Sequence, residues 1–235
     1  MPIYQIAKLN IRIEPVTPQT ERRLLPYLCD SEGYDFDASV MRQEIDAYIE
    51  GSATPCLPYL AEDALVLTKI SRTVLSDYDG CFFHSSCLEM DGEGYLFTAL
   101  SGTGKSTHTR NWRRYFGDRV LMINDDKPLI RRIGDTFFVC STPWMGKSNI
   151  GCNRIAPIKA VYVLKRGAEN TASLTTPARQ MRPLMEATLL PGSREDMIKL
   201  LELFDGLFRQ AKLIELFCNQ EPDSARVAYE AANRR

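Results

Sequence analysis

A glycine-rich segment constrains the fold of this 235-residue chain more than any other feature. Residues 99–107 read Ala-Leu-Ser-Gly-Thr-Gly-Lys-Ser-Thr, after an apolar run at 95–100 and at the start of an expected helix, Lys105–Phe116. Glycines let the backbone turn successive N–H groups inward around an anion, and a following helix adds the positive end of its dipole. The order of strand, loop and helix therefore predicts a phosphate-binding loop.

The predicted loop places nucleotide contacts along most of its length. Lys105 would reach the β- and γ-phosphates, and the Ser106 hydroxyl would bind Mg²⁺. Ala99 stands where the pattern G-x-x-x-x-G-K-[ST] has its first glycine, and alanine fits there only with a negative φ. A bare Gly-Lys-Ser/Thr arises by chance in about one chain in ten of this size, and the strand–loop–helix setting makes chance much rarer. The expected nucleotide-binding residues are Ser101, Gly102, Thr103, Gly104, Lys105, Ser106 and Thr107.

Two adjacent acidic residues, Asp125 and Asp126, follow an apolar run at 119–123, about twenty residues after Lys105. At a strand end beside a phosphate-binding loop, one carboxylate can hold Mg²⁺ while the other accepts the proton of an attacking hydroxyl. The alternative is a solvated turn, because the residues of Asn-Asp-Asp-Lys-Pro favour turns. Beside the predicted loop we favour catalysis, with Ser106 and Asp126 as the Mg²⁺ ligands.

A second loop, residues 142–149, combines a cation with a glycine and a bulky aromatic residue. Its sequence, Thr-Pro-Trp-Met-Gly-Lys-Ser-Asn, suits a clamp or lid over a triphosphate, in which Lys147 stabilises negative charge. An ordinary surface loop around a packed Trp144 is the alternative, and the sequence favours the two almost equally.

The rest of the chain predicts a mixed α/β sheet with frequent hairpins, not a purely parallel one. Residues 1–78 are expected to form an accessory region, and residues 79–235 the domain that carries the loop. Tight-turn residues at 91–94 join expected strands 81–90 and 95–100, and a turn at 134–135 joins 129–133 to 136–140. The other expected strands are 3–13, 119–123, 159–164 and 213–218, and the other expected helices are 38–50, 62–75, 177–190, 194–210 and 224–233.

Composition excludes several classes of protein. Lys and Arg number 29 against 30 Asp and Glu, which gives a net charge of −1 and argues against broad nucleic-acid binding. The apolar runs fall short of the roughly 20 residues of a membrane span, and the start of the chain has no signal-peptide core. Seven cysteines without a C-x-x-C pair indicate reduced thiols. We therefore expect a cytoplasmic protein that binds neither membranes nor nucleic acid.

One cysteine–histidine cluster offers a different function. Cys81, His84 and Cys87 stand at three-residue intervals, which raises the possibility of a zinc-binding structural module. Zinc needs a fourth ligand, and His108 is the only other histidine in the sequence. We rank this alternative well below phosphate binding.

Residues 81–167 resemble the C-terminal catalytic domain of bacterial HPr kinase/phosphorylase, whose nucleotide fold is shared with phosphoenolpyruvate carboxykinase. The resemblance rests on FHSSCLEMDGEGYLFTALSGTGKSTHTRNW and, after the expected helix, MINDDKPLI. These segments hold a histidine, a hairpin with a glycine-containing turn, the phosphate loop and the paired aspartates in the order typical of that family. The resemblance implies that His84 lies near the γ-phosphate as a catalytic or orienting group, and that the protein is a homo-oligomer. The alternative for His84 is a structural histidine on a strand.

These features together predict an ATP-dependent kinase that transfers the γ-phosphoryl group of Mg-ATP to a hydroxyl. The acceptor would be a serine of a small protein or peptide, or a small metabolite. A nucleotide-binding regulator that transfers nothing is the main alternative, because Ala99 departs from the loop pattern and no Arg-Gly-Leu-Gly segment follows the aspartates. The expected catalytic residues are His84, Asp125, Asp126 and Lys147.

Overall fold

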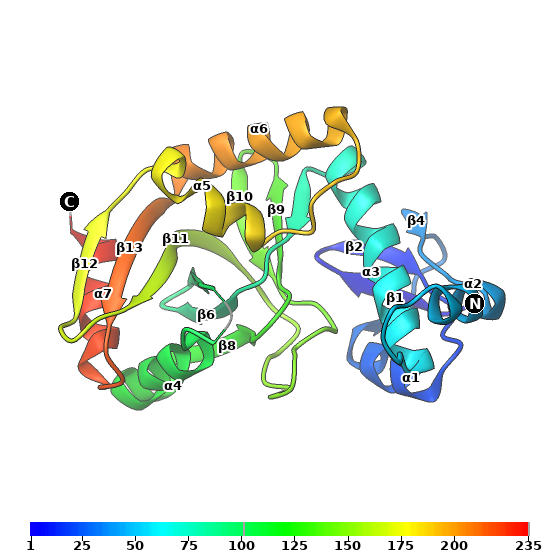
Figure 1. Cartoon of the computed structure of the whole chain (residues 1–235), viewed down its shortest axis with the longest axis horizontal. Coiled ribbons are helices and arrows are strands. Elements are labelled where there is room, and N and C mark those ends of the chain that lie inside the picture. Colours follow the sequence, from blue (N-terminus) through cyan, green and yellow to red (C-terminus); the bar gives the residue numbers. More distant parts are fainter. Residues whose placement is uncertain (101, 235) are drawn as a thin grey trace.

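The computed structural model describes residues 1–100 and 102–234 and contains two β-sheets, one of four strands and one of nine. In Figure 1 the small sheet, coloured blue, lies on the right with the first three helices, and the large sheet lies on the left. In the large sheet β7 (Glu93–Thr98) and β13 (Lys212–Cys218) run parallel to β11 (Ile155–Arg166), and the other described pairings are antiparallel. The predicted mixed α/β class is therefore confirmed.

The small sheet is built around an N-terminal hairpin, with strand order β3-β1-β2-β4. The single strand predicted at 3–13 is wrong, because the chain reverses at Ala7 and Lys8, whose φ angles are 54° and 60°. Neither residue type signals such a turn, since glycine and asparagine normally occupy these positions. The elements of this part are β1 (Ile3–Ile6), β2 (Leu9–Arg12), α1 (Pro18–Leu24), the 3-10 turn η1 (Leu25–Tyr27), β3 (Leu28–Cys29), β4 (Phe36–Asp37), α2 (Arg42–Glu50) and α3 (Pro58–Asp77).

The large sheet has the strand order β5-β9-β10-β11-β7-β6-β8, with β13 paired to β11 and β12 paired to β13. The predicted helix Lys105–Phe116, the hairpin of 129–133 with 136–140, and the helix Arg194–Gln210 are confirmed with their bounds. The strand at 171–174 was not predicted, and the helix predicted at 177–190 ends at Glu186. The remaining elements are β5 (Gly80–Phe82), β6 (Ser86–Met90), α4 (Lys105–Phe116), η2 (Gly117–Arg119), β8 (Val120–Asn124), β9 (Leu129–Ile133), β10 (Thr136–Cys140), β12 (Thr171–Leu174), α5 (Pro177–Glu186), α6 (Arg194–Gln210) and α7 (Asp223–Asn233).

The strand predicted at 81–90 is broken, and the break shapes the site. β5 pairs with β9, whereas β6 pairs with β7 and β8, so residues 83–85 carry the chain from one part of the sheet to another. Phe83 anchors this crossing, because it forms an isolated bridge with Thr188 and packs edge-on against Phe204 of α6 at 6.2 Å between ring centroids. His84 therefore lies in a connection between strands and not within one.

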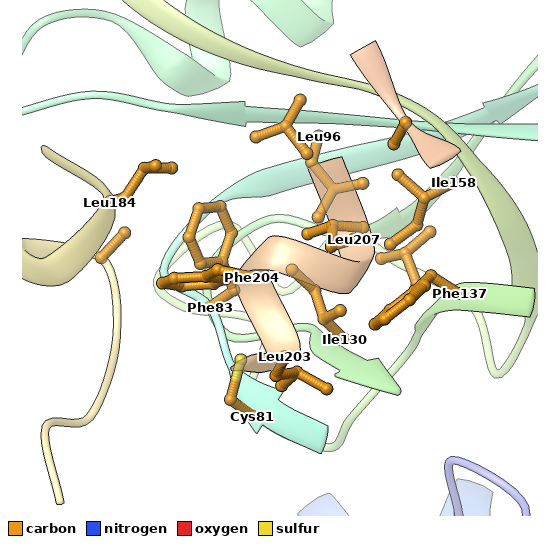
Figure 2. Packing of buried hydrophobic residues seen from close by; sticks show 14 of the residues in the cluster. Cys81, Phe83, Leu96, Ile130, Phe137, Ile158, Leu184, Leu203, Phe204 and Leu207 are labelled. Atoms are coloured by element: carbon orange, nitrogen blue, oxygen red, sulfur yellow. The ribbon is translucent and has the colours of Figure 1, made fainter. Parts of the chain in front are cut away.

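Three apolar clusters hold these layers together. One lies between the sheet and α6, where Phe83, Phe204 and Leu207 are buried (Figure 2). A second lies beside α4 and α7 and contains Trp112. The third fills the N-terminal part but also includes Phe82, Leu129 and Trp144, so it crosses the boundary predicted after residue 78. That division into two domains stays a prediction. Within 1–100 and 102–234, no helix has the length and apolar character needed to cross a membrane.

Candidate active site

The glycine-rich loop joins β7 to the N-terminus of α4, as its sequence predicts. Gly102 and Gly104 have φ angles of 77° and 121°, a region that residues with a Cβ rarely occupy. The Thr103 hydroxyl and N–H both donate to the Leu100 carbonyl, at 2.7 and 3.1 Å, which closes the turn. The φ angle of Ala99 is not positive, so alanine in place of the first glycine of the pattern causes no backbone strain. Ser101 lies outside the described residues.

Lys105, the first residue of α4, faces the two aspartates. Desolvation lowers the pKa of its ammonium, while the negative charges of Asp126 and Asp125 oppose that shift. A partly desolvated cation at a helix N-terminus attracts a bound anion, because the first N–H groups of a helix have no partner within the helix.

The aspartate pair lies in a turn after β8 that is held by Asn124. The buried Asn124 side chain accepts hydrogen bonds from the N–H groups of Asp126 and Lys127, at 2.8 and 2.9 Å. Its amide nitrogen donates to the Thr142 carbonyl at 3.0 Å, so the second loop supports the turn. The segment is therefore a turn, as the alternative expected, but hydrogen bonds to the buried Asn124 side chain hold its backbone in place.

The two carboxylates have different partners. Asp125 accepts hydrogen bonds from the hydroxyls of Ser86 and Ser148, each at 2.6 Å. Asp126 forms an ion pair with Lys127 at 2.5 Å, and its other oxygen lies 3.4 Å from Nε2 of His84. Asp125 is therefore oriented by neutral donors, whereas Asp126 lies between a cation and an imidazole.

His84 is fixed by its backbone and points its ring into the site. Its N–H donates to the Ala187 carbonyl at 2.5 Å, and its carbonyl accepts from the Thr98 hydroxyl at 3.1 Å. Partial burial is the larger cause that lowers the pKa of the imidazole, and the positive charge of Lys105 is the next. The negative charge of Asp126 raises the pKa. The ring is consequently neutral near pH 7 and able to accept a hydrogen bond or a proton.

The loop at 142–149 packs its tryptophan, as one of the two alternatives expected, while the role of Lys147 as a clamp over a triphosphate stays a prediction. Trp144 is packed, edge-on against Phe82 at 5.9 Å, and its indole N–H donates to Asp63 at 3.0 Å. The next residues pass over the aspartates, where Gly146 approaches so closely that an added Cβ would lie 2.9 Å from the Cβ of Asp126. Lys147, the next residue, is exposed.

These groups surround one cavity of about 450 Å³. It brings together nearly all residues that the sequence singled out. Thr103 instead lines an adjoining cavity of about 360 Å³, which also contains Gly102, Gly104 and Thr107. The lining residues of the first cavity are His84, Gly102, Gly104, Lys105, Ser106, Thr107, Asp125, Asp126, Gly146, Lys147 and Ser148.

Three contributors to this site were not predicted from the sequence. Ser86 and Ser148 bind Asp125 from positions distant in the chain, and Arg166 at the end of β11 donates to the Gly102 carbonyl at 2.6 Å. No local pattern marks the two serines. Arg166 had one signal, a charged residue at the end of a buried parallel strand, where ligands of α/β folds commonly bind.

The zinc-binding alternative is wrong for the described residues. They contain no group of three or more His, Cys, Asp or Glu side chains placed to hold a metal ion. Cys81 and Cys87 face the apolar core, as Figure 2 shows for Cys81, and burial raises the pKa of Cys81 to about 12. His108 is buried beside Trp112 instead. A protonated thiol in an apolar core is not a zinc ligand.

No family model matches the sequence, and no curated protein matches it. Among solved structures, the HPr(Ser) kinase/phosphatase from Coxiella burnetii is similar to this chain at 10% sequence identity and a TM-score of 0.32. The match covers 55% of this chain and 92% of that one. Membership of the family that the sequence resembles therefore stays a prediction.

Proposed function

We propose that this protein is a phosphotransferase that moves the γ-phosphoryl group of Mg-ATP to a hydroxyl acceptor. The observation that carries the proposal is the shared cavity in which Lys105, at the N-terminus of α4, faces Asp125 and Asp126. A cation and free N–H groups on one side suit phosphate oxygens, and carboxylates on the other suit a metal ion and an attacking hydroxyl.

The donor set fits Mg²⁺. The Ser106 hydroxyl and the Asp126 carboxylate line the same cavity, and Mg²⁺ binds through one or two carboxylates together with substrate phosphates and water. When bound, Mg²⁺ neutralises charge on the phosphate oxygens. The few protein ligands match this mode of binding, which needs no cluster of three acidic or histidine side chains.

The nucleoside would occupy the adjoining 360 Å³ cavity. This cavity shares Gly102, Gly104 and Thr107 with the first, so one nucleotide can extend across the loop. Arg166 and Gln220 also line it and offer hydrogen bonds to a ribose or base.

The chain's own groups account for the transfer. Lys105 and the α4 N-terminus hold the phosphates in place, while Lys147 balances the charge that develops on the transferred group. The acceptor oxygen bonds to the γ-phosphorus as the bond from that phosphorus to the bridging oxygen of ADP breaks. The acceptor proton passes to a carboxylate of the aspartate pair, whose orientation is set by Ser86, Ser148 and His84.

The test measures release or transfer of γ-phosphate from Mg-ATP by purified protein. We expect Asp125→Asn and Asp126→Asn each to lower the rate by about 10²- to 10⁴-fold while nucleotide binding persists. Asp135→Asn is the matched control, because Asp135 is exposed in the β9–β10 turn. Bound nucleotide without any turnover would instead support the non-catalytic regulator.

A further inference from the structure

A second large cavity borders the one that holds Lys105 and the aspartate pair. Its volume is about 870 Å³, within the range of pockets that hold small molecules or peptide segments. It shares Asp126, Gly146 and Lys147 with the cavity at the glycine-rich loop. A ligand in this cavity would therefore reach Asp126, which the glycine-rich loop's cavity also contains.

The N-terminal part of the chain forms the outer wall of this cavity. Arg22, Arg23 and Tyr27 come from the segment of α1 and η1, and Tyr59, Leu60 and Asp63 come from the first turns of α3. The residues that the sequence left without a role thus lie directly beside the proposed site of transfer.

A buried network fixes this wall. Asp63, 7% exposed, accepts the indole N–H of Trp144 and forms an ion pair with Arg23. Glu62, fully buried, accepts from the N–H groups of Val16 and Thr17, at 2.6 and 3.0 Å, and so holds the start of α1. Arg22 and Arg23 therefore belong to a helix, α1, that is hydrogen-bonded to α3. Asp63 of α3 in turn binds Trp144 in the loop at 142–149.

The charge lining the cavity is predominantly positive. Four cations, Arg22, Arg23, Lys127 and Lys147, line it against two carboxylates. Arg23 pairs with Asp63 and Lys127 with Asp126, so the excess is two positive charges. Arg23 uses one nitrogen on Asp63, which leaves its other N–H groups without a protein partner among the described residues. An arginine stays charged even when partly buried, so these donors attract an anion.

We propose that this cavity binds the phosphate acceptor and selects one that carries carboxylates near its hydroxyl, such as a serine in an acidic peptide segment or a small hydroxy acid. The inference rests on the proposed function. The acceptor hydroxyl would lie at Asp126, which lines both cavities, and its carboxylates would contact Arg22 and Arg23. Its proton passes to the aspartate pair, the phosphoryl group to its oxygen, and ADP leaves.

The test uses matched acceptors with the full-length protein and labelled Mg-ATP. One peptide has a serine flanked by glutamates, a second has the same serine flanked by lysines, and glycerate and malate represent small hydroxy acids. We expect the acidic probes to be labelled at least about tenfold faster than the lysine peptide, a difference of about 1.4 kcal/mol. Labelling of the acidic peptide or of the hydroxy acids tells which source supplies the carboxylates.

Charge reversal locates the effect in the cavity. Arg22→Glu should lower labelling of the acidic probe by about tenfold and reduce the preference over the lysine peptide. Arg42→Glu is the matched control, because Arg42 is exposed and lines neither cavity. Equal labelling of acidic and basic peptides, an unaffected Arg22→Glu variant, or ATP turnover with transfer to neither acidic probe would overturn the inference. Absence of Mg-ATP binding by the unaltered protein would overturn the proposed function instead.

Discussion

The ring of His84 faces the site and lies near two cations, Lys105 and Lys127. Burial and Lys105 lower the pKa of its imidazole, so it takes up a proton only at a lower pH than an ordinary histidine, near 6.5. Once protonated, the His84 ring would form an ion pair with the Asp126 carboxylate, whose oxygen lies 3.4 Å away. That carboxylate would then be less free to take part in phosphoryl transfer.

We therefore expect the rate of phosphoryl transfer to stay level as the pH falls from 8 to the usual histidine value near 6.5, and to decrease only below it. Rates measured across this range should show the inflection in the unaltered protein and not in His84→Gln. An inflection above pH 7, or one that persists in His84→Gln, would contradict the role assigned to His84.

The other histidine affects stability and not the site. His108 is buried, accepts the indole N–H of Trp112 at 3.0 Å, and has its pKa lowered by desolvation to about 3. Below pH 6.5 the unfolded chain binds a proton here that the folded protein does not, so the free energy of unfolding decreases with falling pH. The slope is about 0.7 kcal/mol per pH unit at pH 6.5 and approaches about 1.4 kcal/mol per pH unit near pH 5. Urea unfolding between pH 6.5 and 5 should show this contribution in the unaltered protein and not in His108→Gln; equal slopes in the two proteins would contradict it.

At the level of elements, the loop at 142–149 packs closely against the turn after β8, with Gly146 in contact with Asp126. Gly146 has a φ of 67°, and a Cβ there would meet Asp126. Gly134 in the β9–β10 turn has a φ of 59° with open space around it, so it carries the same backbone preference without the contact.

Gly146→Ala and Gly134→Ala should therefore each lose about 1–2 kcal/mol of stability through the left-handed backbone, but only Gly146→Ala should lower phosphoryl transfer as well. Chemical unfolding and rate measurements on both variants separate the two effects. Similar rates in the two variants would show that the position of Asp126 does not depend on Gly146.

The same elements show what the sequence could predict. The helix Lys105–Phe116 and the β9–β10 hairpin were predicted with their bounds because glycines mark where they end or turn. The hairpin at Ala7 and Lys8 and the break at residues 83–85 were missed, because tertiary packing imposes those backbone angles on residues without a turn preference. In the site, the loop and the aspartate pair were predicted from local patterns. Ser86, Ser148 and Arg166 were not, since their contacts join residues far apart in the chain.

At the scale of the whole molecule, the N-terminal part and the rest share one apolar cluster. Phe82, Leu129 and Trp144 pack with the buried residues of the N-terminal sheet, and the Asp63–Trp144 hydrogen bond crosses at the same place. Separating the two parts would expose this cluster to water, at a cost of about 25 cal/mol per Å² of apolar surface.

We expect one cooperative unfolding transition. Trp112 belongs to α4 and is buried in the core, and Trp144 lies at the junction. The variants Trp112→Phe and Trp144→Phe therefore each leave one tryptophan as a fluorescent reporter. Fluorescence of either reporter and circular dichroism should give coincident urea transitions. A junction signal that changes before the helical signal would mean that the N-terminal part unfolds separately.

The central claim, a nucleotide site at the glycine-rich loop, is tested most directly by thermal unfolding with Mg-ATP, with Mg-GTP and without nucleotide. A ligand that binds only the native state stabilises it by about 2.7 kcal/mol at a hundredfold excess over its dissociation constant. We predict a raised transition for the unaltered protein that is lost in Lys105→Ala. No shift with either nucleotide, or an equal shift in Lys105→Ala, would contradict the account.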